Sequence, residues 1–161
     1  MAIYLDTKTT GLRHSDSDSI VEIAIVNDDG KVLIDTLIDP EISIPWYSTK
    51  IHGITDAMVE GKPTLNEVMP TILDIISNQV TVIYNADLYL NFFPGNLSEA
   101  KKIECAMHFF NLITEIQGSR KIDFAALCAG HIWQGDAHRA LTDALACRSV
   151  WLWLHTDTTQ N

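Results

Sequence analysis

The chain has 161 residues, 47% of them hydrophobic, and 21 Asp and Glu against 11 Lys and Arg give it a formal net charge of -10. This length and composition predict one domain with a buried core and exclude a disordered chain. The acidic balance excludes broad electrostatic binding to nucleic acid, which usually needs a basic face. A polyanionic substrate would need a local basic patch, bound metal ions or recognition of a chain end.

The cysteines and the first residues indicate where the protein works. Cys105, Cys128 and Cys147 are odd in number, widely separated and free of any C-x-x-C pattern, which fits neither a disulfide framework nor a structural zinc site. The start "MAIYLD" has no basic region and reaches an acid at its sixth residue, so we expect no signal peptide. The "VWLWL" run at 150–154 is too short to span a bilayer. We therefore expect a soluble cytoplasmic protein with no membrane partner.

Three strands are predicted at the start of the chain. The apolar run 2–6 ends in Asp6, and the β-rich runs 20–27 and 31–38 flank "DDG", a strong hairpin signal. Residues i and i+2 of a strand point to the same face, so the Lys8 ammonium should project beside the Asp6 carboxylate. We expect these two side chains to share one role.

Helical patterns dominate the rest of the chain. Thr64 and Glu67 have the spacing of a capping box before apolar residues at helical period, although Pro70 predicts a kink or a late start. Residues 39–45 should form an irregular connection, 80–84 a strand, and 85–93 either a helix or extended chain. Further helices are predicted at 105–116, at 123–133 and from about 137 to 155. The fold class is therefore α/β, a mixed sheet with an antiparallel hairpin flanked by helices, in one domain over 1–156 with a frayed tail at 157–161.

Three stretches carry the candidate chemistry: "LDTKTTGL" at 5–12, "YNADLYLNFF" at 84–93 and "HRALTDA" at 138–144. Their order and spacing resemble the three motifs of the DEDDh, or DnaQ-like, 3′-to-5′ exonucleases. The segments "VEIAIV" and "IHGITDAMVEGKPT" also look like that family, and the resemblance covers roughly residues 3–150. Exonuclease X is the most similar type, given the compact size and "NFFPG" after the second motif. The resemblance implies a ribonuclease H-like fold and a nucleic-acid 3′ end, of single-stranded DNA or RNA, as substrate.

The chemistry of such a family explains its acidic motifs. Two divalent ions about 4 Å apart can activate a water and stabilise the leaving 3′ oxygen of a phosphodiester, and they need carboxylates to hold them. Mg²⁺ and Mn²⁺ prefer such oxygen ligands, and a nearby histidine can take the proton from the attacking water. The resemblance therefore implies Mg²⁺ or Mn²⁺ if the site is active, and none if it is not.

The family's catalytic residues can be carried over position by position. The resemblance implies metal-ligand roles for Asp6 and Asp143 and the general-base role for His138. It implies that Thr9, Thr10, Gly11 and Leu12 hold the terminal nucleotide and that Asn85 also binds substrate. His52 resembles part of the family's substrate-end loop, and a plain turn explains it equally well.

Two acidic positions of the family pattern are lost. Lys8 stands in place of the first-motif glutamate, Tyr89 in place of the second-motif aspartate, and Tyr84 in place of the histidine that opens the second motif. Four carboxylates would supply a charge of -4, whereas Asp6, Lys8 and Asp143 sum to -1. An ammonium close to a divalent ion costs a few kcal/mol at an effective dielectric of about 20.

Two hypotheses follow from the altered motifs. The protein is either a 3′-to-5′ exonuclease with weak or altered hydrolysis, or an inactive exonuclease-fold module that binds nucleic-acid ends or a protein partner. The acidic surface makes a protein partner credible. Lys8 either weakens metal binding or fills the metal position itself, and Tyr89 lies either in the core or at the vacated ligand position.

Overall fold

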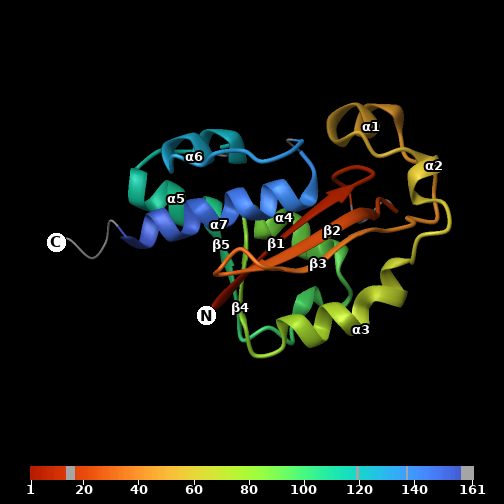
Figure 1. The fold of residues 1–161 in the computed structure, drawn as a ribbon, viewed down its shortest axis with the longest axis horizontal. Helices are drawn as coiled ribbons and strands as arrows, with labels where there is room; N and C mark the ends of the chain where they lie inside the picture. The colour runs from red at the N-terminus through yellow and green to blue at the C-terminus, as the bar shows by residue number, and fades with distance from the viewer. Residues whose placement is uncertain (14–16, 119, 137, 157–161) are drawn as a thin grey trace.

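The computed structural model describes residues 1–13, 17–118, 120–136 and 138–156. Its centre is a five-stranded mixed sheet with the strand order β3-β2-β1-β4-β5 (Figure 1). β2 pairs antiparallel with both β1 and β3, whereas β4 pairs parallel with β1 and β5. The strands span Ala2–Thr9 (β1), Ile20–Asn27 (β2), Val32–Leu37 (β3), Val80–Ile83 (β4) and Lys102–Cys105 (β5).

Helices cover both faces of this sheet (Figure 1). They span Trp46–His52 (α1), Asp56–Val59 (α2), Leu65–Ile76 (α3), Ala86–Tyr89 (α4), Ala106–Thr114 (α5), Ile122–Cys128 (α6) and Ala140–Thr156 (α7), with short 3₁₀ turns at Leu90–Phe92 and Pro94–Leu97. α5, α6 and α7 pack on one face of the sheet, and α3 packs on the other. The predicted α/β fold class and the mixed sheet are confirmed.

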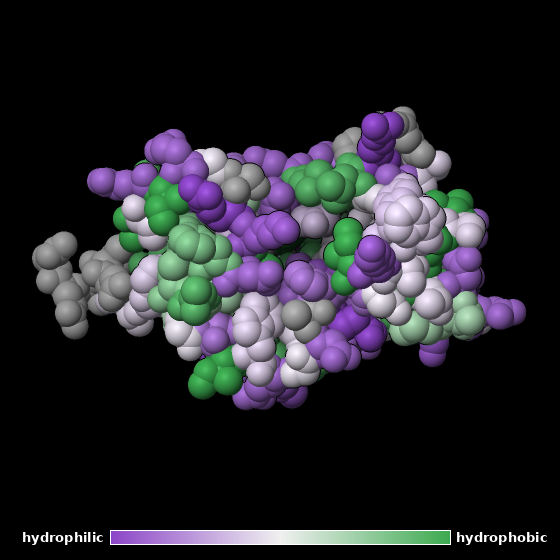
Figure 2. Space-filling view, turned by 90° about the horizontal axis from the view of Figure 1, so that it is seen from above, coloured by the Kyte–Doolittle hydropathy of each residue, from purple (hydrophilic) through white to green (hydrophobic). Residues whose placement is uncertain are grey.

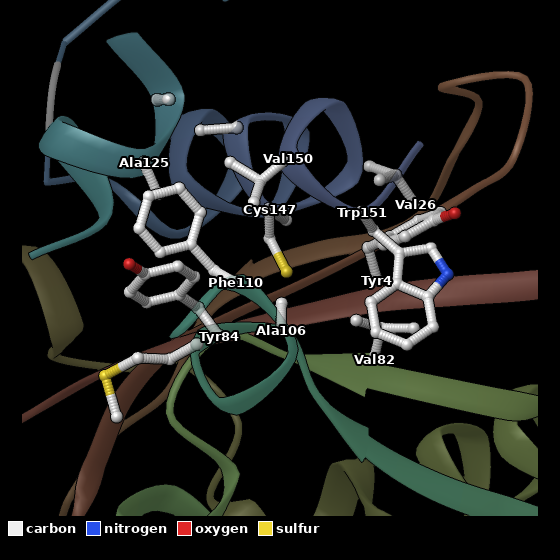
Figure 3. Packing of buried hydrophobic residues seen from close by; sticks show 14 of the residues in the cluster. Tyr4, Val26, Val82, Tyr84, Ala106, Phe110, Ala125, Cys147, Val150 and Trp151 are labelled. Carbon is white, nitrogen blue, oxygen red and sulfur yellow. The ribbon is translucent and has the colours of Figure 1, made fainter. Parts of the chain in front are cut away.

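Alternation along β1 separates the two cores. Tyr4 faces α7 and joins a cluster that α5 and α6 complete, whereas Ile3 and Leu5 face α3. Figure 3 shows the α7 side, where side chains of the sheet, α5, α6 and α7 interdigitate. Asp6 and Lys8 follow Tyr4 at intervals of two, so the same alternation places both on the α7 face.

Local signals in the sequence account for several elements. Gly30 with a φ of 79° donates to the Asn27 carbonyl and closes the predicted hairpin between β2 and β3. The Thr64 and Glu67 capping box begins α3, and the helix continues through Pro70. The predicted alternative that the helix begins only at or after Pro70 is therefore wrong.

Other boundaries differ from the prediction. The predicted elements included neither α1 nor β5, and β1 continues past Asp6 to Thr9. α6 ends at Cys128 instead of residue 133, and α7 begins at Ala140. The predicted start of that helix at 137 and the predicted tail at 157–161 lie outside the described residues. Within the described part of the chain, no helix is both long enough and apolar enough to cross a membrane.

Candidate active site

A cleft of about 1140 Å³ opens where β1 and β4 end. One side is formed by the loop after β1 together with α1, and the other by the start of α6 and the segment before α7. Figure 2 looks onto the molecule from the side of α1 and α6 and shows hydrophilic and hydrophobic residues mixed across this face. All three sequence motifs contribute residues to this cleft, which brings together segments far apart in the chain.

At the base of the cleft, one ammonium lies between two carboxylates. Lys8 Nζ is 2.5 Å from Asp143 Oδ2, to which it donates a hydrogen bond, and 3.0 Å from Asp6 Oδ2. The three side chains are only 13%, 11% and 4% exposed for Lys8, Asp6 and Asp143. Asp143 comes from the first turn of α7, so this contact ties the last helix to β1. The predicted pairing of Lys8 with Asp6 is therefore present, and Asp143 joins it.

Burial sets the electrostatics of this triad. Desolvation raises the pKa of the Asp6 carboxyl to about 7, because the neighbouring Lys8 offsets the cost of burial only in part and Asp143 adds to it. Burial by itself would lower the pKa of the Lys8 ammonium, but Asp6 and Asp143 outweigh it and the pKa is raised. Asp6 Oδ2 and Asp143 Oδ1 are buried without an aligned hydrogen-bond donor. One cation thus compensates two buried carboxylates.

This arrangement does not fit a two-metal centre. Among the described residues, no three His, Cys, Asp or Glu side chains are grouped to hold a metal ion. The Lys8 ammonium stands against the two carboxylates that would be ligands, and its positive charge opposes a dication at that place. Glu22 is a further buried acid, but its carboxylate is already bound by Arg139 and the Ala140 N–H.

Glu22 fixes the start of α7. Its carboxylate accepts hydrogen bonds from Arg139 Nε at 3.0 Å, from Arg139 Nη2 at 2.7 Å and from the Ala140 backbone N–H at 2.9 Å. His138 directly precedes this pair and adopts a left-handed backbone with a φ of 66°. His138 lines the cleft from the turn that precedes α7.

The residues expected to hold the terminal nucleotide differ in whether they line the cleft and in whether their side chains bond within the protein. Thr9 Oγ1 donates to the Gly11 carbonyl, and Thr10 Oγ1 donates to Asp18 while accepting from the Ser19 N–H. Thr10 does not line the cleft, so its hydroxyl shapes the loop and is not presented to a ligand. Gly11 and Leu12 line the cleft, and Leu12 is 61% exposed.

The His52 side chain links the end of α1 to the end of β1. Its Nδ1 accepts from the Ile54 N–H at 3.0 Å, which places the ring proton on Nε2, and Nε2 donates to the Thr9 carbonyl at 3.2 Å. Burial lowers the pKa of His52 and keeps the ring neutral. Both ring nitrogens are therefore used within the protein, although the ring lines the cleft.

The second motif contributes Tyr84, Asn85 and Tyr89 to the cleft. Asn85 begins α4 without a side-chain cap, so its amide is not used by the helix. Burial raises the pKa of the Tyr89 hydroxyl, and so does the charge of Asp6. Tyr89 lines the same cleft as the triad. Tyr89 is at the same time packed against Phe92 in the core.

Several cleft residues were missed from the sequence. Tyr47 and Ile51 come from the unpredicted α1, and Arg120 and Lys121 come from the segment just before α6. The adjacent basic pair Arg120–Lys121 in an acidic chain was an available signal. No pattern marked Tyr47 or Ile51, because α1 begins after Pro45 without a side-chain cap.

A mixed sheet with this strand order, flanked by helices and carrying the three motifs at one cleft, defines a ribonuclease H-like exonuclease fold. Residues 3–150 match the model of the RNase_T family, described as "Exonuclease". The chain is 34% identical to an uncharacterized exonuclease of Escherichia phage 186, over 88% of this chain and 81% of the relative. It is 30% identical to the DNA polymerase III subunit epsilon of Rickettsia felis, over 93% of this chain and 72% of the relative.

The solved structures agree. A structure of exonuclease X in complex with 5′ overhanging duplex DNA superimposes with a TM-score of 0.79 at 25% identity, covering 100% of this chain and 95% of that chain. The match to the PolC-type DNA polymerase III of Clostridium perfringens, 36% identical over 62% of this chain, spans only 7% of that relative's length. The chain therefore belongs to the DnaQ-like 3′-to-5′ exonuclease family.

Proposed function

We propose that this protein binds the 3′ end of a single-stranded nucleic acid in the cleft and hydrolyses it weakly. The observation that carries the proposal is the Lys8 ammonium, which contacts Asp6 and Asp143 where the family pattern has a third carboxylate. Exonucleases of this family typically use divalent metals. Because the triad does not fit two such ions, weak hydrolysis is the expected consequence.

The chain's own residues have separate proposed roles. Asp6 and Asp143 are the two remaining metal-ligand positions, and Lys8 competes for them. His138, which lines the same cleft as Asp143, is the group to take a proton from the attacking water. Thr9, Gly11, Leu12 and Asn85 border the space for the terminal nucleotide.

A restoration experiment tests the proposal. The wild type, Asp6→Ala and the double variant Lys8→Glu with Tyr89→Asp are incubated with labelled single-stranded DNA and RNA in EDTA, Mg²⁺ or Mn²⁺. We expect slow metal-dependent trimming by the wild type, loss of trimming in Asp6→Ala, and about 100-fold faster trimming by the double variant. This factor corresponds to removing a few kcal/mol of charge repulsion. A matched Lys8→Gln variant separates the loss of the ammonium from the gain of a carboxylate.

The results divide the possibilities. Wild-type trimming as fast as that of the double variant would contradict weak hydrolysis. If only the double variant trims while the wild type still binds oligonucleotides, the protein is an end-binding module without hydrolysis. If the wild type neither binds nor trims, the proposal fails.

The end-binding module without hydrolysis is the second candidate function. The Lys8 ion pairs favour it because they offset part of the charge of Asp6 and Asp143 without a metal. The acidic charge of -10 suits a protein partner with a basic face. Since relatives of this chain include a DNA polymerase III and a DNA polymerase III subunit epsilon, a replicative polymerase is the partner to test. Co-purification with a polymerase catalytic subunit, abolished at high salt, would support it.

A further inference from the structure

Two aromatic side chains stand exposed at the edge of the cleft. Trp46 and Tyr47 are the first two residues of α1, and they are 75% and 53% exposed. Their rings lie edge to face, with the centroids 6.0 Å apart. Large exposed aromatic groups beside a binding site mark an interaction surface more often than a packing accident.

This pair is continuous with the cleft. Tyr47 and Ile51, one turn further along α1, both line the cleft, whereas Trp46 does not. Ile51 is 65% exposed, and the exposed Leu12 borders the same cleft from the loop after β1. An apolar rim therefore runs from the terminal-nucleotide space outward along α1 to Trp46.

The rim is fixed relative to the triad. Ser48 Oγ donates to the Thr10 carbonyl at 2.6 Å, and His52 Nε2 donates to the Thr9 carbonyl at 3.2 Å. Both contacts hold α1 against the end of β1, the strand that carries Asp6 and Lys8. Little conformational freedom would be lost when a ligand contacts both places.

Charge allows a phosphate backbone to approach α1. The segment 42–55 contains Lys50 and no Asp or Glu, in a chain with a net charge of -10. Lys50 is exposed on the helix that carries Trp46 and Tyr47. The carboxylates that flank this segment are Glu41 and Asp56, and Asp56 accepts hydrogen bonds from Ser43 and from the Ile44 N–H. The surface thus combines aromatic faces with an exposed lysine, the two kinds of group that bind single-stranded nucleic acid.

We propose that Trp46 and Tyr47 form a stacking platform for an unpaired base upstream of the terminal nucleotide. The inference rests on the proposed function, since it places a second contact on the same strand. An unpaired base offers a free π-face to an aromatic ring, whereas a base inside a duplex is already stacked on both sides. The platform therefore selects single-stranded ends over blunt duplex ends.

A length series in EDTA tests the platform without hydrolysis. Affinities of the wild type, Trp46→Ala, Trp46→Phe and Leu127→Ala are measured for oligothymidylates of two to eight nucleotides and for a blunt hairpin. Leu127 is the matched control, since it is 75% exposed on α6 and does not line the cleft. We expect the wild-type affinity to rise by about tenfold once the strand is long enough to reach Trp46, as one stacked base provides.

The variants decide the outcome. Trp46→Ala should lose the increase with length, Trp46→Phe should keep most of it, and Leu127→Ala should behave as the wild type. Quenching of tryptophan fluorescence by the longer strands should diminish in Trp46→Phe if Trp46 is the stacked residue.

An unchanged length series in Trp46→Ala, or equal wild-type affinity for the blunt hairpin, would overturn the platform. If the wild type binds and trims strands and Trp46→Ala keeps the full increase of affinity with length, the platform falls and the proposed function stands. If the wild type binds no strand of any length, both fall. If Trp46→Ala no longer binds a polymerase subunit but keeps its affinity for oligonucleotides, Trp46 belongs to a protein interface and the platform is overturned.

Discussion

Lys8 is the residue on which both the stability of the fold and the chemistry of the cleft depend. Replacing it by the uncharged Lys8→Met leaves Asp6 and Asp143 facing each other in a buried site. We expect a loss of about 3 kcal/mol of unfolding free energy at pH 8, the usual range for breaking one partner of a buried pair. Urea denaturation measures it, and adding Asp6→Asn to the same chain should recover part of the loss. Wild-type stability in Lys8→Met would contradict the ion pairs.

His52 gives a second prediction at the same scale, in the dependence of stability on pH. Because burial lowers the pKa of His52 in the folded state, the unfolded chain binds a proton more readily. His52 therefore supports stability above its ordinary pKa of 6.5, and that support is lost as the pH falls from 6.5 through the folded pKa.

The measurement is the difference between wild type and His52→Asn in unfolding free energy from pH 8 to pH 5. The difference should shrink as the pH falls below 6.5, because only the wild type loses the contribution of His52. A constant difference would show that His52 has the same pKa in the folded and the unfolded protein.

At the scale of elements, the loop after β1 depends on a close approach between Gly11 and Asp18. A Cβ at Gly11 would lie 2.3 Å from Asp18 Oδ2, and that carboxylate accepts hydrogen bonds from the Thr10 hydroxyl and the Arg13 N–H. Gly11→Ala should therefore displace Asp18 and cost about 1–2 kcal/mol of stability.

A double-mutant cycle checks this dependence. Asp18→Ala removes the same hydrogen bonds directly, so the double variant should be little less stable than Asp18→Ala alone. Thermal unfolding supplies the stabilities, and oligonucleotide affinity should fall with them because this loop borders the cleft. Additive losses would mean that Gly11 and Asp18 act independently.

At the scale of the whole molecule, patterns with strong local signals predicted the architecture. The "DDG" hairpin, the Thr64 capping box and the apolar runs of β1, β2 and β4 depend on residues adjacent in sequence. β5 was missed because it is only four residues long and follows directly into α5. α1 was missed because long-range contacts hold it, the Ser48 and His52 bonds to the end of β1, and not a cap of its own.

The residues of the candidate active site, like the elements of the fold, could be predicted where the signal lies in adjacent residues or in motif spacing. Strand alternation predicted that Lys8 would lie beside Asp6, and the motif spacing led to His138 and Asp143. The distance from Lys8 to Asp143 depends on how α7 crosses the sheet, which no local pattern specifies. The uses of Thr10 and His52 within the protein likewise follow from Asp18 and Ile54, partners that only the folded chain reveals.

The charge of the whole chain makes a final prediction about salt. Among the described residues that line the cleft, Arg13, Arg120 and Lys121 are the cations outside the triad. Contact of all three with phosphates would release about three counterions, and each contributes roughly 0.7 to the slope of log affinity against log salt for a single strand. We expect a slope no steeper than about -2 in EDTA, shallow because the remaining surface is acidic. Arg120→Gln should make the slope shallower by roughly 0.7 for every nucleic-acid sequence tested. A wild-type slope steeper than about -4 would contradict this prediction, because it would require phosphate contacts outside the cleft.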